Sequence, residues 1–145
     1  MIAAVDTDRL LIRPFHPTDA GFICNLLNSP GWLTYVGDRS VHTEADAIAY
    51  LEKGPLTQYR EHGFGLMLVE RKTDGARLGM CGFISRSDLP HPDIGFAFLP
   101  QFEGQGYAFE AARQLLLEAP QRYGITEVLA ITLPTNHRSI GLLQK

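Results

Sequence analysis

The glycine-containing segment 99–108, Leu-Pro-Gln-Phe-Glu-Gly-Gln-Gly-Tyr-Ala, constrains the fold of this 145-residue chain more than any other stretch. It follows a nearly all-apolar run at residues 93–99, which predicts a central strand. It precedes a helical pattern that is expected to begin at Gly104 or Gln105 and to extend to about Tyr123. The apolar stripe of that helix comprises Ala108, Ala111, Ala112, Leu115 and Leu116.

The loop between this strand and this helix has the chemistry of an anion site. A helix start leaves backbone N–H groups unpaired at the positive end of the helix dipole. Glycine lets an anion approach such groups closely, so the amides of residues 104–108 could hold a diphosphate. The same two glycines are also typical of a plain structural turn. The segment matches neither the G-x-x-x-x-G-K-[ST] loop nor the G-x-G-x-x-G dinucleotide motif.

The rest of the chain alternates between strand and helix patterns without repeats or linkers. The expected order is strand, two helices, three strands, helix, strand and helix, which predicts a single mixed α/β domain over residues 1–145. The further predicted strands cover residues 8–15, 64–72, 76–87 and 125–133. The further predicted helices cover residues 18–28, 43–61 with a break at 54–55, and a segment from about 135.

Several local signals support these elements. Thr18 or Asp19 is expected to cap the first helix and Thr43 the second. The expected buried faces of these two helices comprise Phe22, Ile23, Leu26 and Leu27, and Ala47, Ile48, Tyr50 and Leu51. Asp74 and Gly75 predict a hairpin turn with positive φ. The glycines at 79 and 82 of the predicted strand 76–87 indicate close packing or a bulge.

Composition excludes several classes of function. The net charge is −3 and Lys and Arg form no block, which argues against a nucleic-acid binder. No apolar run reaches the about 20 residues that a membrane-spanning helix needs, and the first residues lack a signal-peptide pattern. Cys24 and Cys81 lack metal-ligand spacing, so no metal is expected, and both read as buried thiols of a cytoplasmic protein.

Five segments, taken together, resemble one family. Residues 101–106 fit the pattern [QR]-x-x-G-x-[GA] with Gln101, Gly104 and Gly106. The other matches are T-x-R-L-x-L-R-P at 7–14, I-G-[FY] at 94–96, G-Y-A-x-E-A at 106–111 and N-x-x-S at 136–139. In this order they are similar to the GNAT superfamily of acetyl-CoA-dependent N-acetyltransferases. The branch they resemble includes the ribosomal-protein alanine and serine N-acetyltransferases.

The resemblance implies a coenzyme A site. The diphosphate would lie on the amides of Gly104, Gln105, Gly106, Tyr107 and Ala108, next to Gln101. The pantetheine arm would run along the 93–99 strand near Phe98 and Leu99. Asn136 would hydrogen-bond that arm and Ser139 would lie near the thioester sulfur, as one of the two catalytic candidates. From the residues alone, Asn136 could equally be a helix N-cap and Ser139 a surface serine.

The resemblance also implies the reaction, in which a primary amine attacks the thioester carbonyl directly. The acceptor would be a protein N-terminus or a small-molecule amine. Asp93 is the preferred catalytic base, with Glu110 and Glu103 as alternatives, although Asp93 could also simply end a turn. His137 could serve as acid or base or be solvated. The competing interpretation is a CoA-binding or interaction module that does not turn over.

Two further expectations concern the edges of the site. Trp32 and Tyr35 could line an acceptor pocket or belong to the core. The family pattern continues beyond residues 142–145 with two more strands, so the domain is expected to be C-terminally incomplete. A partner chain, for example in a homodimer, could then complete the sheet.

Overall fold

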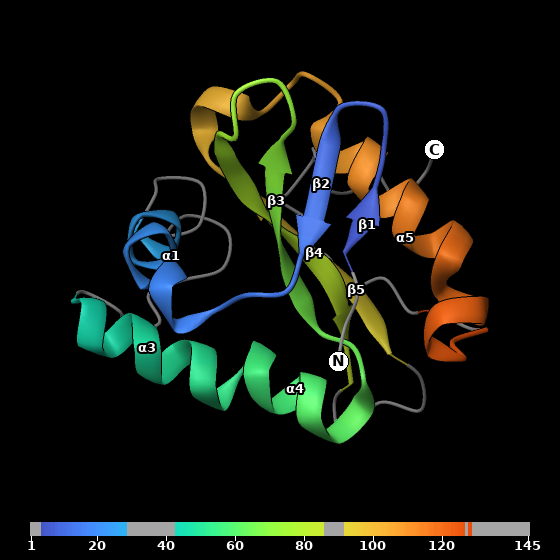
Figure 1. Cartoon of the computed structure of the whole chain (residues 1–145), viewed down its shortest axis with the longest axis horizontal. Coiled ribbons are helices and arrows are strands. Elements are labelled where there is room, and N and C mark those ends of the chain that lie inside the picture. The colour runs from blue at the N-terminus through green and yellow to red at the C-terminus, as the bar shows by residue number, and fades with distance from the viewer. Residues whose placement is uncertain (1–3, 29–42, 86–91, 127, 129–145) are drawn as a thin grey trace, which may run out of the picture.

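The structure is a computed structural model that describes residues 4–28, 43–85, 92–126 and 128. In these residues one antiparallel sheet has the strand order β1-β2-β3-β4-β5 (Figure 1). Its strands are β1 Val5–Asp6, β2 Leu10–Arg13, β3 Leu66–Arg71, β4 Arg77–Ile84 and β5 Asp93–Phe98. The sequence prediction missed β1, because two residues are too few to show a period-2 pattern.

Helices cover both faces of the sheet. They are α1 Ala20–Leu27, α3 Glu44–Lys53, α4 Pro55–His62 and α5 Tyr107–Tyr123, with short 3₁₀ turns at Pro17–Asp19 and Pro100–Phe102. The α5 helix packs on one face in a core that includes Ile12, Met67 and Leu115. The α1 and α3 helices form the second core with Leu68 and Met80 on the opposite face (Figure 1). The mixed α/β prediction is therefore confirmed.

The predicted central position of the 93–99 strand is only partly tested. β5 is the last strand of the described sheet, with β4 on one side. The strand expected at 125–133 lies mostly outside the described residues, and the helix expected from about 135 lies wholly outside them. Within the described residues, β5 therefore has one edge without a strand partner.

The glycines of β4 pack as closely as the sequence indicates. A Cβ at Gly79 would lie 2.2 Å from the Ala97 oxygen, and a Cβ at Gly82 would lie 2.2 Å from the Gly65 oxygen. The register also shifts next to Gly79, so that Leu78 is an extra residue of β4. Both expectations, close packing and a bulge, are confirmed.

The helix and turn signals are largely confirmed. The Thr43 hydroxyl accepts a hydrogen bond from Asp46 N at 3.1 Å. α4 follows the break at 54–55, and Gly75 has the positive φ, 72°, of the expected turn. α5 continues through Pro120 to Tyr123 and ends at Gly124, which adopts a left-handed φ of 68°.

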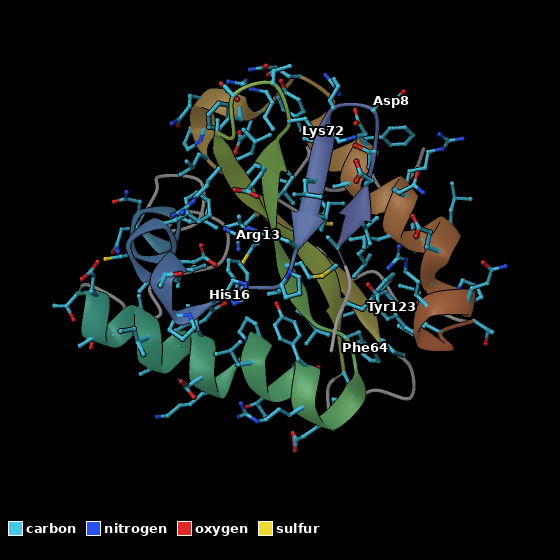
Figure 2. The ribbon with its side chains drawn as sticks, viewed as in Figure 1. Asp8, Arg13, His16, Phe64, Lys72 and Tyr123 are labelled. Atoms are coloured by element: carbon cyan, nitrogen blue, oxygen red, sulfur yellow. The ribbon has the colours of Figure 1, made fainter. Side chains whose placement is uncertain are left out.

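Some burial predictions were wrong. Ile48 and Leu116 are 40% and 43% exposed, because each lies at the margin of its helix's apolar stripe. Cys24 is half-buried, whereas Cys81 is fully buried, and burial raises the pKa of the Cys81 thiol to about 12. Side chains in and around both cores are drawn in Figure 2.

Asp19 has a different role from the one predicted. It occupies the N-cap position of α1, but its side chain makes no capping hydrogen bond to that helix. Its carboxylate instead accepts two hydrogen bonds from the Arg13 guanidinium, both at 3.0 Å, and one from His16 N at 2.8 Å. The side chain is therefore used to attach the segment before α1 to β2.

Candidate functional site

The glycine loop connects β5 to α5 in a conformation that only glycine adopts easily. Gly104 has φ 77° and Gly106 has φ 82°, both in the left-handed region. Because a right-handed helix cannot contain these angles, α5 begins at Tyr107 rather than at Gly104 or Gln105 as predicted. The 3₁₀ turn Pro100–Phe102, which the sequence did not reveal, fills the first part of the loop.

The loop exposes backbone amides where an anion could bind. The first backbone hydrogen bond of α5 runs from Glu110 N to Gly106 O at 3.0 Å, so the amides of Tyr107 and Ala108 have no helical acceptor. A Cβ at Gly104 would meet nothing within 4 Å, and the residue is exposed. The predicted diphosphate seat is thus open and has the positive end of a helix dipole behind it.

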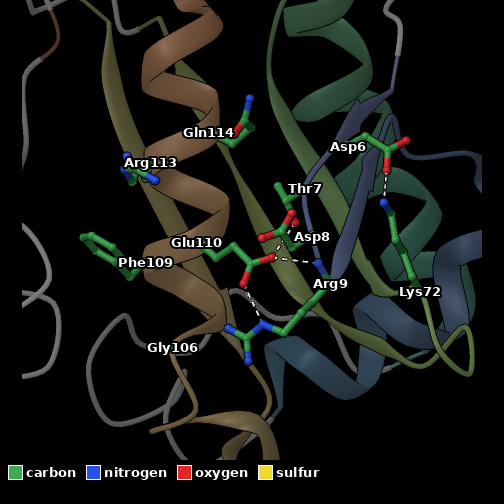
Figure 3. A pocket seen from close by; sticks show the side chains of 10 residues that line it. All are labelled: Asp6, Thr7, Asp8, Arg9, Lys72, Gly106, Phe109, Glu110, Arg113 and Gln114. Atoms are coloured by element: carbon green, nitrogen blue, oxygen red, sulfur yellow. Dashed lines mark hydrogen bonds and ion pairs between the residues drawn. The ribbon is translucent and has the colours of Figure 1, made fainter.

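Glu110 is held in place by the turn between β1 and β2. Its carboxylate accepts hydrogen bonds from the Thr7 hydroxyl at 2.5 Å, from Arg9 N at 3.0 Å and from Arg9 Nε at 2.6 Å (Figure 3). Burial by itself raises the pKa of Glu110, but these hydrogen bonds outweigh it and keep the pKa below its usual value. With all these donors engaged, Glu110 is a poor candidate for a catalytic base.

Arg9 extends this network into the loop. Its Nη1 donates to the Gln105 carbonyl at 3.2 Å, and its guanidinium lies 4.4 Å from the centroid of the Tyr107 ring. On the other side, Arg71 Nη1 donates to the Tyr107 hydroxyl at 3.4 Å. Tyr107 is buried and contacts both of these cations. The Gln105 side chain in turn donates to the Gln101 carbonyl at 3.1 Å.

A depression of about 750 Å³ lies beside the loop, between the β1–β2 turn and the first turns of α5 (Figure 3). Its charged residues carry both signs. Arg9 is paired with Glu110, and Lys72 is paired with Asp6. We therefore interpret this depression as part of the junction between the β1–β2 turn and α5. The sequence weakly indicates these contacts between the β1–β2 turn and α5, since Thr7, Arg9 and Glu110 all belong to the matched motif segments.

The backbone N–H and C=O groups of β5 point alternately toward β4 and toward the opposite edge of the strand. Leu99 N donates to Leu78 O at 2.9 Å, so the N–H of Leu99 points toward β4. Because successive residues of a strand alternate in direction, the backbone groups of Phe98, Phe96 and Ile94 point to the opposite edge. The Leu99 carbonyl accepts a hydrogen bond from Phe102 N at 3.0 Å. Leu99, a predicted cofactor contact, can therefore contribute its side chain but not its amide.

Asp93 lies at the far end of β5 from the loop. It is 3% exposed and pairs across the strands with Ile84. Five strand steps separate it from Phe98, a span of about 17 Å. Among the described residues Asp93 and Asp19 are the buried charged groups, and Asp19 is bonded to Arg13. Glu103, the other alternative base, is half-buried in the loop itself.

The remaining predicted site residues lie outside the described part of the chain. They are Trp32, Tyr35, Asn136, His137 and Ser139. Within the described ranges, no group of His, Cys, Asp and Glu side chains has an arrangement that could hold a metal ion. No helix in those ranges combines the length and the apolar character needed to cross a membrane.

Comparisons with known proteins agree with this architecture. Residues 9–145 match the family model described as Acetyltransferase (GNAT) domain. The uncharacterized protein YkkB of Bacillus subtilis is 30% identical over 96% of this chain and 81% of its own length. An acetyltransferase from Agrobacterium tumefaciens superposes with a TM-score of 0.84 at 23% identity, covering 99% of this chain and 82% of that one.

A second similar structure is RimL, a ribosomal L7/L12 alpha-N-protein acetyltransferase in complex with coenzyme A. It superposes with a TM-score of 0.84 at 15% identity, over 98% of this chain and 81% of that one. At this identity the likeness shows the fold alone. The family match over nearly the whole chain goes further, and the protein belongs to the GNAT acetyltransferase family.

Proposed function

We propose that this protein transfers the acetyl group of acetyl-CoA to a primary amine by direct attack of the amine on the thioester. The observation that carries the proposal is the loop at 104–108. Its two left-handed glycines precede the acceptor-free amides of Tyr107 and Ala108 at the start of α5, and a Cβ at Gly104 would meet no atom within 4 Å. Such a position suits the diphosphate of coenzyme A.

The pantetheine arm would extend from this loop along the edge of β5 that faces away from β4. The outward backbone groups of Phe98 and Phe96 would pair with its amides, as an added strand would. Leu99 and Gln101 would contact the arm and the diphosphate at the loop end, and Asn136 would hydrogen-bond the arm from beyond the described residues. An outward N–H of β5, at Phe96 or Ile94, would polarise the thioester carbonyl.

The proton transfers require two groups. Asp93 would take a proton from the ammonium group of the acceptor and so free the amine for attack, since it is buried at the end of β5 away from the diphosphate. Ser139 would lie near the departing thiolate. Replacement of Asp93 by Asn should lower kcat by about 10²- to 10⁴-fold, a typical range for a general base, while CoA affinity stays unchanged. Unchanged kcat would remove Asp93 from the mechanism.

Titration calorimetry with CoA and acetyl-CoA, followed by a transfer assay, tests the function. The assay should include N-terminal peptides and small-molecule amines, because the acceptor class is part of the proposal. Failure of the full chain to bind either cofactor would refute the proposal. Binding without transfer to any amine would favour the non-catalytic module.

A pair of substitutions at Gly104 tests the diphosphate seat. Asp and Asn both tolerate a left-handed φ, and a Cβ at this position meets no atom within 4 Å. Gly104→Asp should weaken CoA binding by about 100-fold, since a like charge about 4 Å from the diphosphate costs up to about 4 kcal/mol. Gly104→Asn, the uncharged control, should lose much less. Equal affinities for both variants would place the diphosphate elsewhere.

The acceptor would be a protein N-terminus or a small-molecule amine, in a reducing compartment such as the cytoplasm. RimL, one of the structural neighbours, acts on ribosomal L7/L12, which supports the first class by analogy of fold. The free thiols of Cys24 and Cys81 are consistent with a reducing compartment.

A further inference from the structure

Arg9 contacts the loop at the Gln105–Gly106 peptide group, which lies between the two left-handed glycines and directly before α5. Its Nη1 holds the Gln105 carbonyl at 3.2 Å, and Nη2 lies 3.5 Å from the position that a Cβ of Gly106 would occupy. The guanidinium also stacks 4.4 Å from the Tyr107 ring centroid. Three consecutive residues of the loop are therefore in contact with one side chain from a different part of the chain.

The peptide group between Gln105 and Gly106 is planar and trans. In such a group the carbonyl and the following N–H point in opposite directions. Because the Gln105 carbonyl points at Arg9, the Gly106 N–H points away from Arg9 and from the β1–β2 turn. Rotation of this peptide plane would instead direct a carbonyl oxygen to that side, where it would repel an anion.

Glu110 determines where the Arg9 guanidinium sits. It accepts from Arg9 Nε at 2.6 Å and from Arg9 N at 3.0 Å, so both ends of the Arg9 residue are held by one carboxylate. The Thr7 hydroxyl bonds the same carboxylate, and Leu10 N donates to Thr7 Oγ1 at 2.9 Å. The β1–β2 turn, the first turn of α5 and the glycine loop thus form one connected unit (Figure 3).

We propose that Arg9, positioned by Glu110, fixes the Gln105–Gly106 peptide plane so that the Gly106 amide faces the bound diphosphate. This inference rests on the proposed CoA site and assigns positioning roles to Arg9 and Glu110. A different role, direct attraction of the phosphates by the Arg9 charge, predicts different results. Two substitutions distinguish these roles. Glu110→Gln should change CoA affinity in opposite directions under the two roles, and Arg9→Lys should lower CoA affinity only if Arg9 has the positioning role.

Glu110→Gln is the first test, because the two roles predict changes of CoA affinity in opposite directions. If Glu110 positions Arg9, loss of the carboxylate should weaken CoA binding by about tenfold, the value of one charge-assisted hydrogen bond. If Arg9 acts as a bare charge, removal of the neighbouring negative charge should strengthen CoA binding. Tighter or unchanged binding in calorimetry would therefore overturn the inference.

Arg9→Lys provides the second test. Lysine keeps the positive charge but has no planar fork to bond Glu110 and the Gln105 carbonyl together. We expect it to lose about as much CoA affinity as Arg9→Ala, roughly tenfold. The loss should appear as a raised KM for acetyl-CoA with kcat nearly unchanged. Full retention of affinity by Arg9→Lys would contradict a positioning role.

The Gly106 amide itself supplies a readout that does not depend on the ligand. Its ¹H–¹⁵N resonance in the ligand-free protein should shift in Arg9→Lys and Glu110→Gln. It should not shift in Arg122→Ala, a control that removes the Arg122–Glu118 ion pair on the same helix. An unmoved resonance in the first two variants would refute the inference. Absence of CoA binding by the wild type would refute the proposed function instead.

Discussion

Two carboxylates, on opposite faces of the sheet, each connect the first strands to a helical segment, but they differ in position. Asp19 is 1% exposed at the start of α1 and is bonded by Arg13 and His16 N. The Glu110 side chain is 20% exposed near the start of α5 and is bonded by Thr7 and Arg9. The first belongs to the core, and the second borders the glycine loop.

Because of this difference in burial, we expect loss of Asp19 to lower mainly the stability of the fold and loss of Glu110 to affect mainly the glycine loop. Loss of a partner for the buried Arg13–Asp19 pair leaves a charge with little water, which costs folding free energy. Loss of Glu110 leaves Arg9 half-exposed and able to find water, so the main cost should fall on the geometry of the loop. Comparable sets of hydrogen bonds should thus stabilise the fold on one face and act on the glycine loop on the other.

Asp19→Ala should have the largest effect on stability. We expect the free energy of unfolding to fall by about 3 kcal/mol, because the Arg13 guanidinium and His16 N both lose their acceptor. Urea denaturation measures this change. The control Glu52→Gln, on the exposed side of α3, should remain within about 0.5 kcal/mol of wild type. Comparable stability of the two variants would mean that Asp19 adds no more than a surface charge.

The pH dependence should sharpen the comparison. Burial raises the pKa of Asp19, but hydrogen bonds from Arg13 and His16 N outweigh it, so the pKa lies below its ordinary value of 3.8. A carboxyl with a depressed pKa stabilises the fold above its unfolded pKa, and this contribution is lost as the pH falls through the folded value.

The stability difference between wild type and Asp19→Asn should therefore be constant from neutral pH down to about pH 5. Below about pH 4 the difference should shrink, since protonation removes the charge from the wild-type side chain. Unfolding curves at several pH values test this. A difference that grows on acidification would have the wrong sign for the Asp19–Arg13 pair.

Of the three substitutions Asp19→Ala, Asp19→Asn and Thr7→Val, Thr7→Val should have the smallest effect on stability. It removes one hydroxyl donor of Glu110 and the acceptor of Leu10 N, while both Arg9 donors of Glu110 remain, so we expect a loss of about 1 kcal/mol in stability. CoA affinity should fall less than in Glu110→Gln. Arg122→Ala, which removes the exposed member of the ion pair with Glu118 on α5, serves as the control and should change stability by less than about 0.5 kcal/mol. A larger loss of affinity in Thr7→Val than in Glu110→Gln would make Thr7 the main anchor.

Local sequence signals predicted much of the fold. The Thr43 cap, the Gly75 turn and the position of the glycine loop all depend on residues a few positions apart. Helical and strand periodicities act over similar distances, so they were read correctly for α1, α3, β3 and β4. The exposure of Ile48 and Leu116 was missed, because periodicity does not reveal where a neighbouring element ends.

In the candidate site, too, local features could be predicted from the sequence and contacts between distant segments could not. Gly104 and Gly106 could be recognised in the sequence, because positive φ and close approach are properties of glycine itself. The role of Glu110 could not, since its partner Thr7 lies 103 residues away and a carboxylate shows no preferred donor in the sequence. The direction of the Leu99 amide likewise depends on its pairing with Leu78 across the sheet.

The sequence by itself therefore determined the order of the helices and strands from β2 to α5, the glycine loop before α5 and, through its motifs, the acetyltransferase family. Only the tertiary structure decided that Glu110 accepts hydrogen bonds from the β1–β2 turn, and that Asp19 binds Arg13 instead of capping α1. The physical reason is that conformational preference is local, whereas the partner of a charged side chain is chosen by the packing of segments distant in the chain.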